Sequence, residues 1–246
     1  METRPASAKQ VSTALGRGAA FQALALAFAY PSTDVVTRLE ARWSALLNSP
    51  HSWPADLRHA SQQINRLLLH VDSETLESEH IRLFGPAARC PLHETAYGDA
   101  GRLLGRPATL ADIAGFYLAF DLRPSSDNSH PEDHLGLELE FMSLLAVKEA
   151  YAIAEGWQEA LDTTRTAQQR FIQDHLGTWT DAFTEQLRQC QAHPFYLVMG
   201  ESLGALVHAE ITRLQASPVP VGGPVGDPLM GGDSLQCPYA SGNQEE

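Results

Sequence analysis

Hydrophobic residues recur every three or four positions along most of the chain, which is the spacing of one face of an α-helix. Proline, glycine and helix-capping residues interrupt this pattern and mark where helices end. The pattern predicts helices over residues 7–29, 32–47, 54–71, 72–84, 109–120, 131–148, 152–166, 167–176, 178–190 and 194–215. No segment alternates polar and apolar residues as a β-strand would. We therefore predict an all-α protein, with one helical-bundle-like domain of about nine to eleven helices over residues 1–216.

Three segments lack helical periodicity. Residues 85–107 contain four glycines and three prolines, and a loop of this length inside a compact domain is usually functional or disordered. The apolar side chains of Leu92 and Tyr97 argue against disorder there. A polar hinge near residues 121–131 divides the chain close to its midpoint. From residue 217 to 246 the glycine and proline density predicts an extended or disordered tail.

The most informative predicted helix covers residues 131–148, with the sequence PEDHLGLELEFMSLLAVK. Pro131 suits the first turn of a helix, and Glu132 and Asp133 suit the positive end of the helix dipole. Apolar residues cover well over half of the helix surface, which is typical of a helix buried among other helices. His134 and Glu138 lie one turn apart within this apolar arc, beside Met142.

An ionised Glu138 in such surroundings requires a partner, because burying an unpaired carboxylate would cost several kcal/mol. Either a cation or donor from another segment meets it, or the apolar arc opens onto a groove. We hypothesise that Arg82, or the loop from Cys90 to Tyr97, supplies the partner. The alternative for Arg82 is that its side chain extends along apolar neighbours and reaches solvent.

Composition narrows the classes of partner. The chain has 246 residues, of which 43% are hydrophobic and 19% charged, as in an ordinary globular protein. Seventeen basic residues stand against 30 acidic ones, so the formal net charge is −13 at pH 7. Nucleic acid or an anionic membrane would be repelled, whereas a basic peptide would be attracted. Solubility alone is the alternative explanation of this charge.

The cysteines and the N-terminal segment bear on the cellular compartment. Cys90, Cys190 and Cys237 are widely spaced and form no CxxC pair, so we expect neither a disulfide framework nor a zinc finger. We expect the protein to reside in a reducing compartment. No apolar run reaches about 18 residues, so we expect no stable membrane insertion. Residues 19–30 resemble the apolar core of a signal peptide, but a further helical pattern follows them, and we interpret them as the first core helix.

Catalytic motifs are missing from the sequence: it contains no GxxxxGK[ST], HExxH or GxSxG. Two pairs of metal-ligating residues remain, His134 with Glu138 and Cys90 with His93. They leave open an alternative function, a metal-dependent helical-bundle enzyme. Metal sites in helical bundles usually draw carboxylates from several helices, so a hydrogen-bonded histidine is the competing interpretation of His134.

Three stretches of the sequence resemble the TorD/DmsD family of redox-enzyme maturation chaperones. Residues 79–97, EHIRLFGPAARCPLHETAY, are similar to the family pattern ExxRLFxGP…CPxxExxY. Residues 117–142 contain an aromatic segment, the hinge, and then PEDHLGLELEFM. Residues 171–183, FIQDHLGTWTDAF, are similar to a pattern with HL, Trp and Phe. Together they reach across roughly two thirds of the chain, in the order in which the family has them.

This resemblance implies a cytoplasmic, all-helical chaperone without catalytic residues or cofactor. Its partner would be the molybdopterin-containing catalytic subunit of a dimethyl-sulfoxide-reductase-type enzyme. The chaperone would bind the twin-arginine leader of that subunit, assist cofactor insertion and delay export. An accessory subunit retained in the finished oxidoreductase is a further alternative.

The resemblance also implies which residues bind the leader. The physical chemistry agrees, since a peptide with two arginines and an apolar run requires carboxylates beside an apolar trough. The leader-binding residues would be Pro131, Glu132, Asp133, His134, Glu138 and Met142. A supporting loop and its neighbours would comprise Arg82, Cys90, Pro91, Glu94, Tyr97 and Tyr117. For the loop, a structural role and direct contact with the client remain open alternatives.

Overall fold

The computed structural model describes residues 5–48, 62–64, 66–67, 71–86, 88–99, 105–123 and 130–225, and within them it contains helices and no strand. The α-helices are α1 (Pro5–Ala27), α2 (Thr33–Leu47), α4 (Ser73–Phe84), α6 (Arg106–Ala119), α7 (Leu135–Glu155), α8 (Gln158–Phe171), α9 (Gly177–Gln189) and α10 (Pro194–Leu214). A 3-10 turn, η1 (Glu94–Ala96), and a π-helical turn, η2 (Ile172–Leu176), complete the set. The predicted all-α class is confirmed.

Two of the differences between the observed and predicted helix boundaries concern α7 and α8. Helix α7 continues to Glu155 and ends at Gly156, whose φ of 72° lies in the left-handed region that glycine adopts most easily. The helix predicted over 152–166 is therefore split between α7 and α8. The break predicted after residue 166 does not exist, because α8 runs to Phe171. Most of the helix predicted over 54–71, and hinge residues 124–129, lie outside the described residues.

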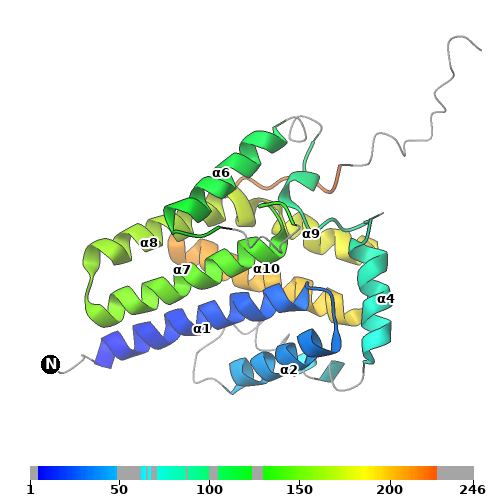
Figure 1. Cartoon of the computed structure of the whole chain (residues 1–246), viewed down its shortest axis with the longest axis horizontal. Helices are drawn as coiled ribbons and strands as arrows, with labels where there is room; N and C mark the ends of the chain where they lie inside the picture. The colour runs from blue at the N-terminus through cyan, green and yellow to red at the C-terminus, as the bar shows by residue number, and fades with distance from the viewer. Residues whose placement is uncertain are drawn as a thin grey trace, which may run out of the picture.

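Helices α1 and α7 form the centre of the molecule and run antiparallel to each other (Figure 1). The hydroxyl of Ser143 on α7 donates to the carbonyl oxygen of Gly18 on α1 at 2.8 Å. Helices α8, α9 and α10 pack around this pair, α2 packs on α1, and α6 lies near the top of the view. Leu139, Phe141 and Leu145 of α7 are almost fully buried. The apolar arc that predicts a buried helix is thus confirmed.

Helix α9 follows α8 through the π-helical turn η2. The Gly177 N–H donates to the carbonyl oxygen of Ile172, five residues earlier. A Cβ atom at position 177 would lie only 2.4 Å from that oxygen, so a larger residue would not fit there. The turn places His175 in the interior, where it takes part in the site described below.

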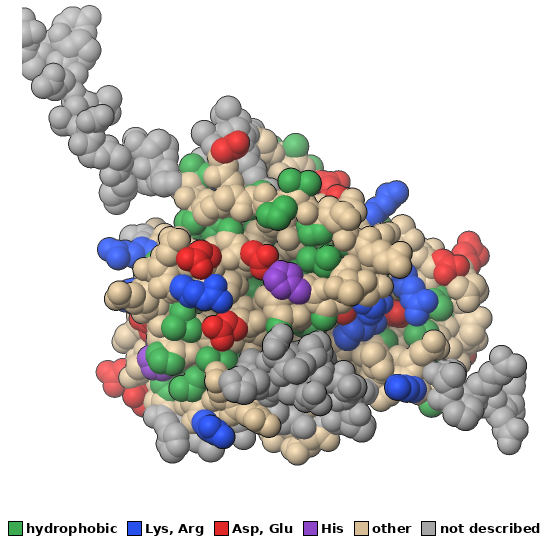
Figure 2. Space-filling view, turned by 180° about the vertical axis from the view of Figure 1, so that it is seen from behind, with side chains coloured by type: hydrophobic (Ala, Val, Ile, Leu, Met, Phe, Trp, Pro, Cys, Tyr) green, Lys and Arg blue, Asp and Glu red, His purple; other side chains and the backbone are tan. Residues whose placement is uncertain are grey.

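The segment after α10 lies against the loop that precedes α6. The Val221 N–H donates to the Thr178 carbonyl at 2.9 Å, and the Val225 N–H donates to the Ala96 carbonyl at 2.9 Å. Residues 217–225 are thus extended and hydrogen-bonded, and residues 226–246, with Cys237, lie outside the described residues. Within the described residues, no helix combines the length and hydropathy needed to cross a membrane. On the face drawn in Figure 2, acidic, basic and hydrophobic side chains are interspersed.

Candidate functional site

The PEDH segment forms a turn in front of α7 instead of the first turn of the helix. The prediction that Pro131 opens the helix is wrong by four residues, since α7 begins at Leu135 with His134 as its N-cap. The backbone of the turn is tied to the 88–97 loop. The Leu135 N–H donates to the Leu92 carbonyl at 2.8 Å, and the Glu94 N–H donates to the Asp133 carbonyl at 3.0 Å.

Asp133 points into the protein and fastens this loop. Its carboxylate accepts hydrogen bonds from the Thr95 N–H at 3.1 Å, from the Thr95 hydroxyl at 2.5 Å and from His93 Nδ1 at 3.3 Å. Burial alone would raise the pKa of Asp133, but the bonds from His93 and Thr95 together outweigh it and hold the pKa at about 2. The side chain is ionised and fully buried, so it does not face a peptide in this conformation.

His134 follows Asp133 in the same turn and is also largely buried. Its Nδ1 accepts a hydrogen bond from the Gly136 N–H at 3.1 Å, which caps α7. The ring stacks on His130 with centroids 4.1 Å apart and meets the edge of His93 at 5.2 Å. Burial is the main cause that lowers the pKa of His134 to about 3, followed by His130 and His93. The imidazole is therefore neutral near pH 7, with its proton on Nε2.

Glu138 and Met142 lie on the interior face of α7, and both are fully buried. The indole N–H of Trp179 on α9 donates to Glu138 at 3.2 Å. The hypothesis that Arg82 pairs with Glu138 is wrong. The guanidinium of Arg82 instead binds Glu79 at 2.6 and 2.7 Å and donates to the Cys190 carbonyl at 3.2 Å.

The loop residues named in the sequence also lie inside the protein. The Tyr97 hydroxyl donates to the Pro91 carbonyl at 2.9 Å, and its ring packs on Trp179 with centroids 5.2 Å apart. Cys90 and Glu94 are buried. The Tyr117 hydroxyl donates to the Glu132 carbonyl at 2.9 Å, which ties α6 to the PEDH turn. Burial, and then the Glu138 carboxylate, raise the pKa of Tyr117. These contacts favour the structural alternative for the loop.

A buried histidine joins two of the motif stretches. His175 Nδ1 lies 3.1 Å from the Glu94 carboxylate, and its Nε2 lies 3.1 Å from the Asp112 carboxylate on α6. Burial alone would lower the pKa of His175, but Glu94 and Asp112 together outweigh it and raise the pKa above its ordinary value. The motif stretches around Glu94 and His175 thus meet in the interior as an ion-paired cluster.

The accessible part of the site is a groove along α7, which we call the α7 groove. It consists of two adjoining hollows of about 580 and 590 Å³ that share Leu137 and Glu140 as wall residues. The first hollow is lined by His134, by α1 and α4, and by the loop before α7. The second lies further along α7. Its apolar wall includes Leu122, Phe141, Leu144 and Val147. Partial desolvation raises the pKa of Glu140, the acidic residue that both hollows share.

Sequence comparisons identify the family. The model of the family described as nitrate reductase delta subunit matches residues 50–185. The chain belongs to this family. A TorD chaperone of Vibrio cholerae is 30% identical over 171 residues, which cover 68% of this chain and 73% of that protein. The selenate reductase assembly chaperone of Thauera selenatis is 34% identical over 144 residues, covering 57% of this chain and 71% of the relative.

Two further comparisons extend over more of the chain. The chlorate reductase assembly chaperone of Ideonella dechloratans is 28% identical over 201 residues, or 80% of this chain and 89% of the relative. A crystal structure of an Archaeoglobus fulgidus protein, described as a redox enzyme maturation protein, covers 78% of this chain and 93% of its own with a TM-score of 0.50. At 18% identity, that structure supports the fold alone. The resemblance to redox-enzyme maturation chaperones is confirmed, and the TorD-family chain is a chaperone and not an enzyme.

Among the described residues, the two pairs of metal-ligating side chains do not come together in one site, as a metal-dependent enzyme would require. Glu138 accepts from Trp179, and His134 caps α7. Within the part of the chain that the structure describes, no group of three or more histidine, cysteine or acidic side chains could hold a metal ion. The relatives are named as chaperones, in agreement with this geometry.

Sequence reasoning missed the residues that the chaperone exposes in the groove. Leu137, Glu140, Leu144 and Val147 share one side of α7 at helical spacing, and they line its hollows. The predicted leader-binding residues Glu138 and Met142 lie on another side. The acidic residue Glu140 among these apolar residues was the sequence signal that could have identified the exposed side of α7. The apolar arc of α7 is so wide, however, that the sequence does not show which of its edges faces outward.

Proposed function

We propose that this chaperone acts in the cytoplasm on the cofactor-free catalytic subunit of a molybdopterin oxidoreductase of the dimethyl-sulfoxide reductase type. It binds the twin-arginine leader of that subunit, assists cofactor insertion and delays export. Relatives named as assembly chaperones of selenate reductase and chlorate reductase support a reductase subunit as the client. The α7 groove is the proposed leader-binding site.

The observation that carries this proposal is the shape and chemistry of the α7 groove. Its two hollows form an apolar trough with Glu140 at their common wall. An amphipathic or apolar helix binds such a trough through side chains spaced three and four residues apart. The apolar run of a leader is a segment of this kind. The first hollow also contains the aromatic rings of Phe28, Tyr30 and Phe84, which offer flat apolar contacts.

Charge supports an arginine-bearing ligand. Glu140 is solvent-exposed at the wall that both hollows share, and partial desolvation there raises its pKa; Arg123 also lines the second hollow. A guanidinium placed against it would favour the ionised form and form a charge-assisted hydrogen bond. The net charge of −13 would also speed the encounter with a cationic peptide.

The proposal divides the predicted site residues into two roles. Leu137, Glu140 and Leu144 contact the leader, and His134 forms part of the wall. Asp133 and Glu138 act from the interior: they hold the turn and the helix in place through Thr95 and Trp179. Met142 is core. Pro131 and Glu132 lie in the turn that begins this end of the groove and are half-buried.

Titration calorimetry with a synthetic leader containing the arginine pair and its apolar run tests the proposal. We expect saturable binding to the full-length chain. The variant Glu140→Gln should bind about tenfold more weakly, a loss of about 1.4 kcal/mol, because the guanidinium loses its ionised partner. Glu155→Gln provides a matched control, since Glu155 is an exposed acid at the far end of the same helix.

Two results would contradict the proposal. A leader that gives no binding to the folded chain would refute leader recognition itself. Equal affinities for the wild type, Glu140→Gln and Glu155→Gln would refute the α7 groove as the site. A leader with both arginines replaced by glutamine should lose at least as large a factor as Glu140→Gln, and combining the two changes should cost less than the sum of the single losses.

A further inference from the structure

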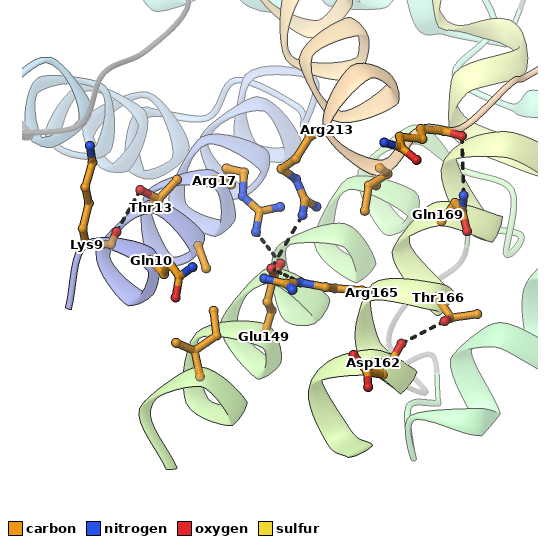
Figure 3. Close-up of a pocket in the computed structure, with 14 residues that line it drawn as sticks. Lys9, Gln10, Thr13, Arg17, Glu149, Asp162, Arg165, Thr166, Gln169 and Arg213 are labelled. Carbon is orange, nitrogen blue, oxygen red and sulfur yellow. Dashed lines mark hydrogen bonds and ion pairs between the residues drawn. The ribbon is translucent and has the colours of Figure 1, made fainter. Parts of the chain in front are cut away.

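A second pocket, of about 800 Å³, lies at the other end of α7, between α1, α8 and α10 (Figure 3). Four basic side chains line it, and they come from three helices: Lys9, Arg17, Arg165 and Arg213. They are four of only 17 basic residues in a chain with a net charge of −13. The leader proposal assigns no role to this pocket.

Two buried carboxylates hold the arginines in place: Glu149, which lines the pocket, and Glu210, which does not. Arg17 bridges Glu149 and Glu210, the latter at 2.9 Å, and Arg165 Nε donates to Glu149 at 2.8 Å. Arg213 binds Glu210 at 2.7 Å. Figure 3 shows Arg17, Arg165 and Arg213 converging on Glu149. Burial would raise the pKa of Glu149, but Arg17 and the other arginines outweigh it and hold the pKa at about 2.

The charges in this cluster do not cancel. Three guanidinium groups and the Lys9 ammonium stand against the carboxylates of Glu149, Glu210 and Asp162, so one net positive charge remains. Asp162, which also lines the pocket, is an exposed acid that accepts a hydrogen bond from Gln158 at 2.8 Å. Asp162 therefore disfavours an anion on its own side and leaves the space between Lys9, Arg165 and Arg213 as the positive part.

Two basic side chains at the pocket keep donors that the cluster does not use. Arg17 is not one of them: its terminal nitrogens bind Gln168, Glu210 and Glu149, and its Nε is enclosed by protein. Among the described residues, neither terminal nitrogen of Arg165 nor the Lys9 ammonium group donates a hydrogen bond. These donors come from α1 and α8, which face each other across the pocket.

We propose that this pocket binds a phosphate group of a small-molecule ligand. A phosphate group carries close to two negative charges and several acceptor oxygens, which match the fork-shaped guanidinium of Arg165 and the ammonium of Lys9. A carboxylate has one charge and would leave donors unpaired. The pocket is much larger than one phosphate group, so it has room for the remainder of a ligand such as a diphosphate ester.

Binding would join the two ends of the described chain. Lys9 and Arg17 belong to α1, and Arg213 belongs to α10, so an anion between them connects the first and last helices. A ligand that binds only the folded chain raises its thermal stability. The pocket lies at the opposite end of α7 from His134, so we expect its occupation to leave leader affinity unchanged.

Calorimetry and thermal unfolding of the full chain with inorganic pyrophosphate test this inference, with sodium chloride at matched ionic strength as the reference. We expect a saturable heat with pyrophosphate and a higher unfolding temperature than with chloride. Arg165→Gln should weaken pyrophosphate binding about tenfold or more, because a positively charged group that can donate two parallel hydrogen bonds is lost. Arg170→Gln, an exposed arginine on the same helix but outside the pocket, should change affinity less than about twofold.

The same experiments contain the results that would overturn the inference. Pyrophosphate and chloride could have equal effects at matched ionic strength, which would indicate general screening. Arg165→Gln and Arg170→Gln could weaken binding equally, which would place the anion elsewhere. Preferential binding of a synthetic acidic peptide over pyrophosphate would contradict the small-molecule class. Because Arg165 is about two-fifths exposed, Arg165→Gln is expected to fold, and circular dichroism checks this.

Discussion

Buried polar side chains from the motif stretches bind one another. Asp133 from the PEDH segment accepts from Thr95, and Glu94 from the preceding loop pairs with His175 beyond α8. Each contact joins segments more than 35 residues apart in sequence. Breaking one of them leaves a charged or polar group buried without its partner, which is far more costly than losing a surface ion pair. These residues therefore fix the geometry of the groove without lining its floor.

The pH dependence of stability should reveal the charge of His175. Its pKa is raised in the folded state by Glu94 and Asp112, against an unfolded value of about 6.5. The stabilisation is therefore fully present below pH 6.5 and is lost as the pH rises through the folded pKa. We expect His175→Gln to lower the free energy of unfolding by about 3 kcal/mol at pH 6 and by less at pH 9. Urea unfolding at both pH values measures this difference.

His208→Gln serves as the control for that experiment. His208 also lies beside a carboxylate, that of Asp181 at 3.0 Å, but both side chains are largely exposed. An exposed pair contributes little, so its variant should differ from the wild type by less than about 1 kcal/mol at either pH. A His175→Gln effect that stays constant or grows between pH 6 and pH 9 would contradict a charged His175.

Glu138 illustrates what sequence can and cannot predict about a single residue. Its place within an apolar arc indicates that a buried carboxylate there needs a partner, and Trp179 provides a hydrogen bond. The identity of that partner depends on which helices meet, and position 179 lies 41 residues further along the chain. Arg82 was the expected cation, but Glu79 lies one turn away on α4 and binds it locally.

At the scale of helices, spacing predicts most elements but not their orientation. The apolar arc of α7 extends around most of the helix, so its sequence alone does not distinguish the side facing the core from the side facing the groove. Tertiary packing decides this: Leu145 is fully buried, whereas Leu144 is only partly buried and lines the groove. The ends of helices were harder to predict than their presence. Asp133 points inward to bind Thr95, so α7 begins only at Leu135, and the helix ends at Gly156.

The adjacent leucines of α7 give a matched pair of variants for this orientation. Leu145 is fully buried, so Leu145→Ala should lower the free energy of unfolding by about 3 kcal/mol through lost packing. Leu144 lines the groove, so Leu144→Ala should cost less than about 1 kcal/mol of stability. Leader affinity should respond in the opposite order, with Leu144→Ala weakening it about fivefold and Leu145→Ala changing it little.

Urea unfolding and calorimetry on the same two proteins check both halves of that prediction. The two substitutions remove identical atoms from neighbouring positions, so differences in side-chain chemistry do not contribute. Equal losses of stability would show that the assigned faces of α7 are incorrect. A weaker leader affinity for Leu145→Ala than for Leu144→Ala would place the leader on a different surface.

For the whole molecule, both proposed sites lie along α7 and both contain charges of either sign. The wall of the proposed leader site includes Glu140 and Arg123, and the proposed phosphate site has Arg165 and Arg213 beside Glu149. The placement of single side chains therefore decides which ligand each site accepts. The sequence gives only the net charge of −13. It does not give the positions of the charges in space, because these depend on how α1, α8 and α10 pack.

That net charge leads to a kinetic prediction. A net charge of −13 attracts a dicationic leader over distances comparable to the screening length, which falls from about 14 Å to about 4 Å between 50 and 500 mM salt. We expect the association rate constant in stopped-flow experiments to fall about tenfold or more across this range, and the dissociation rate constant to change much less, since the apolar contacts of the α7 groove are insensitive to salt. A leader with both arginines replaced by glutamine should show a nearly flat salt dependence. If salt acted mainly on dissociation, the arginines would be held by short-range pairs alone, and the acidic excess would have no part in capture.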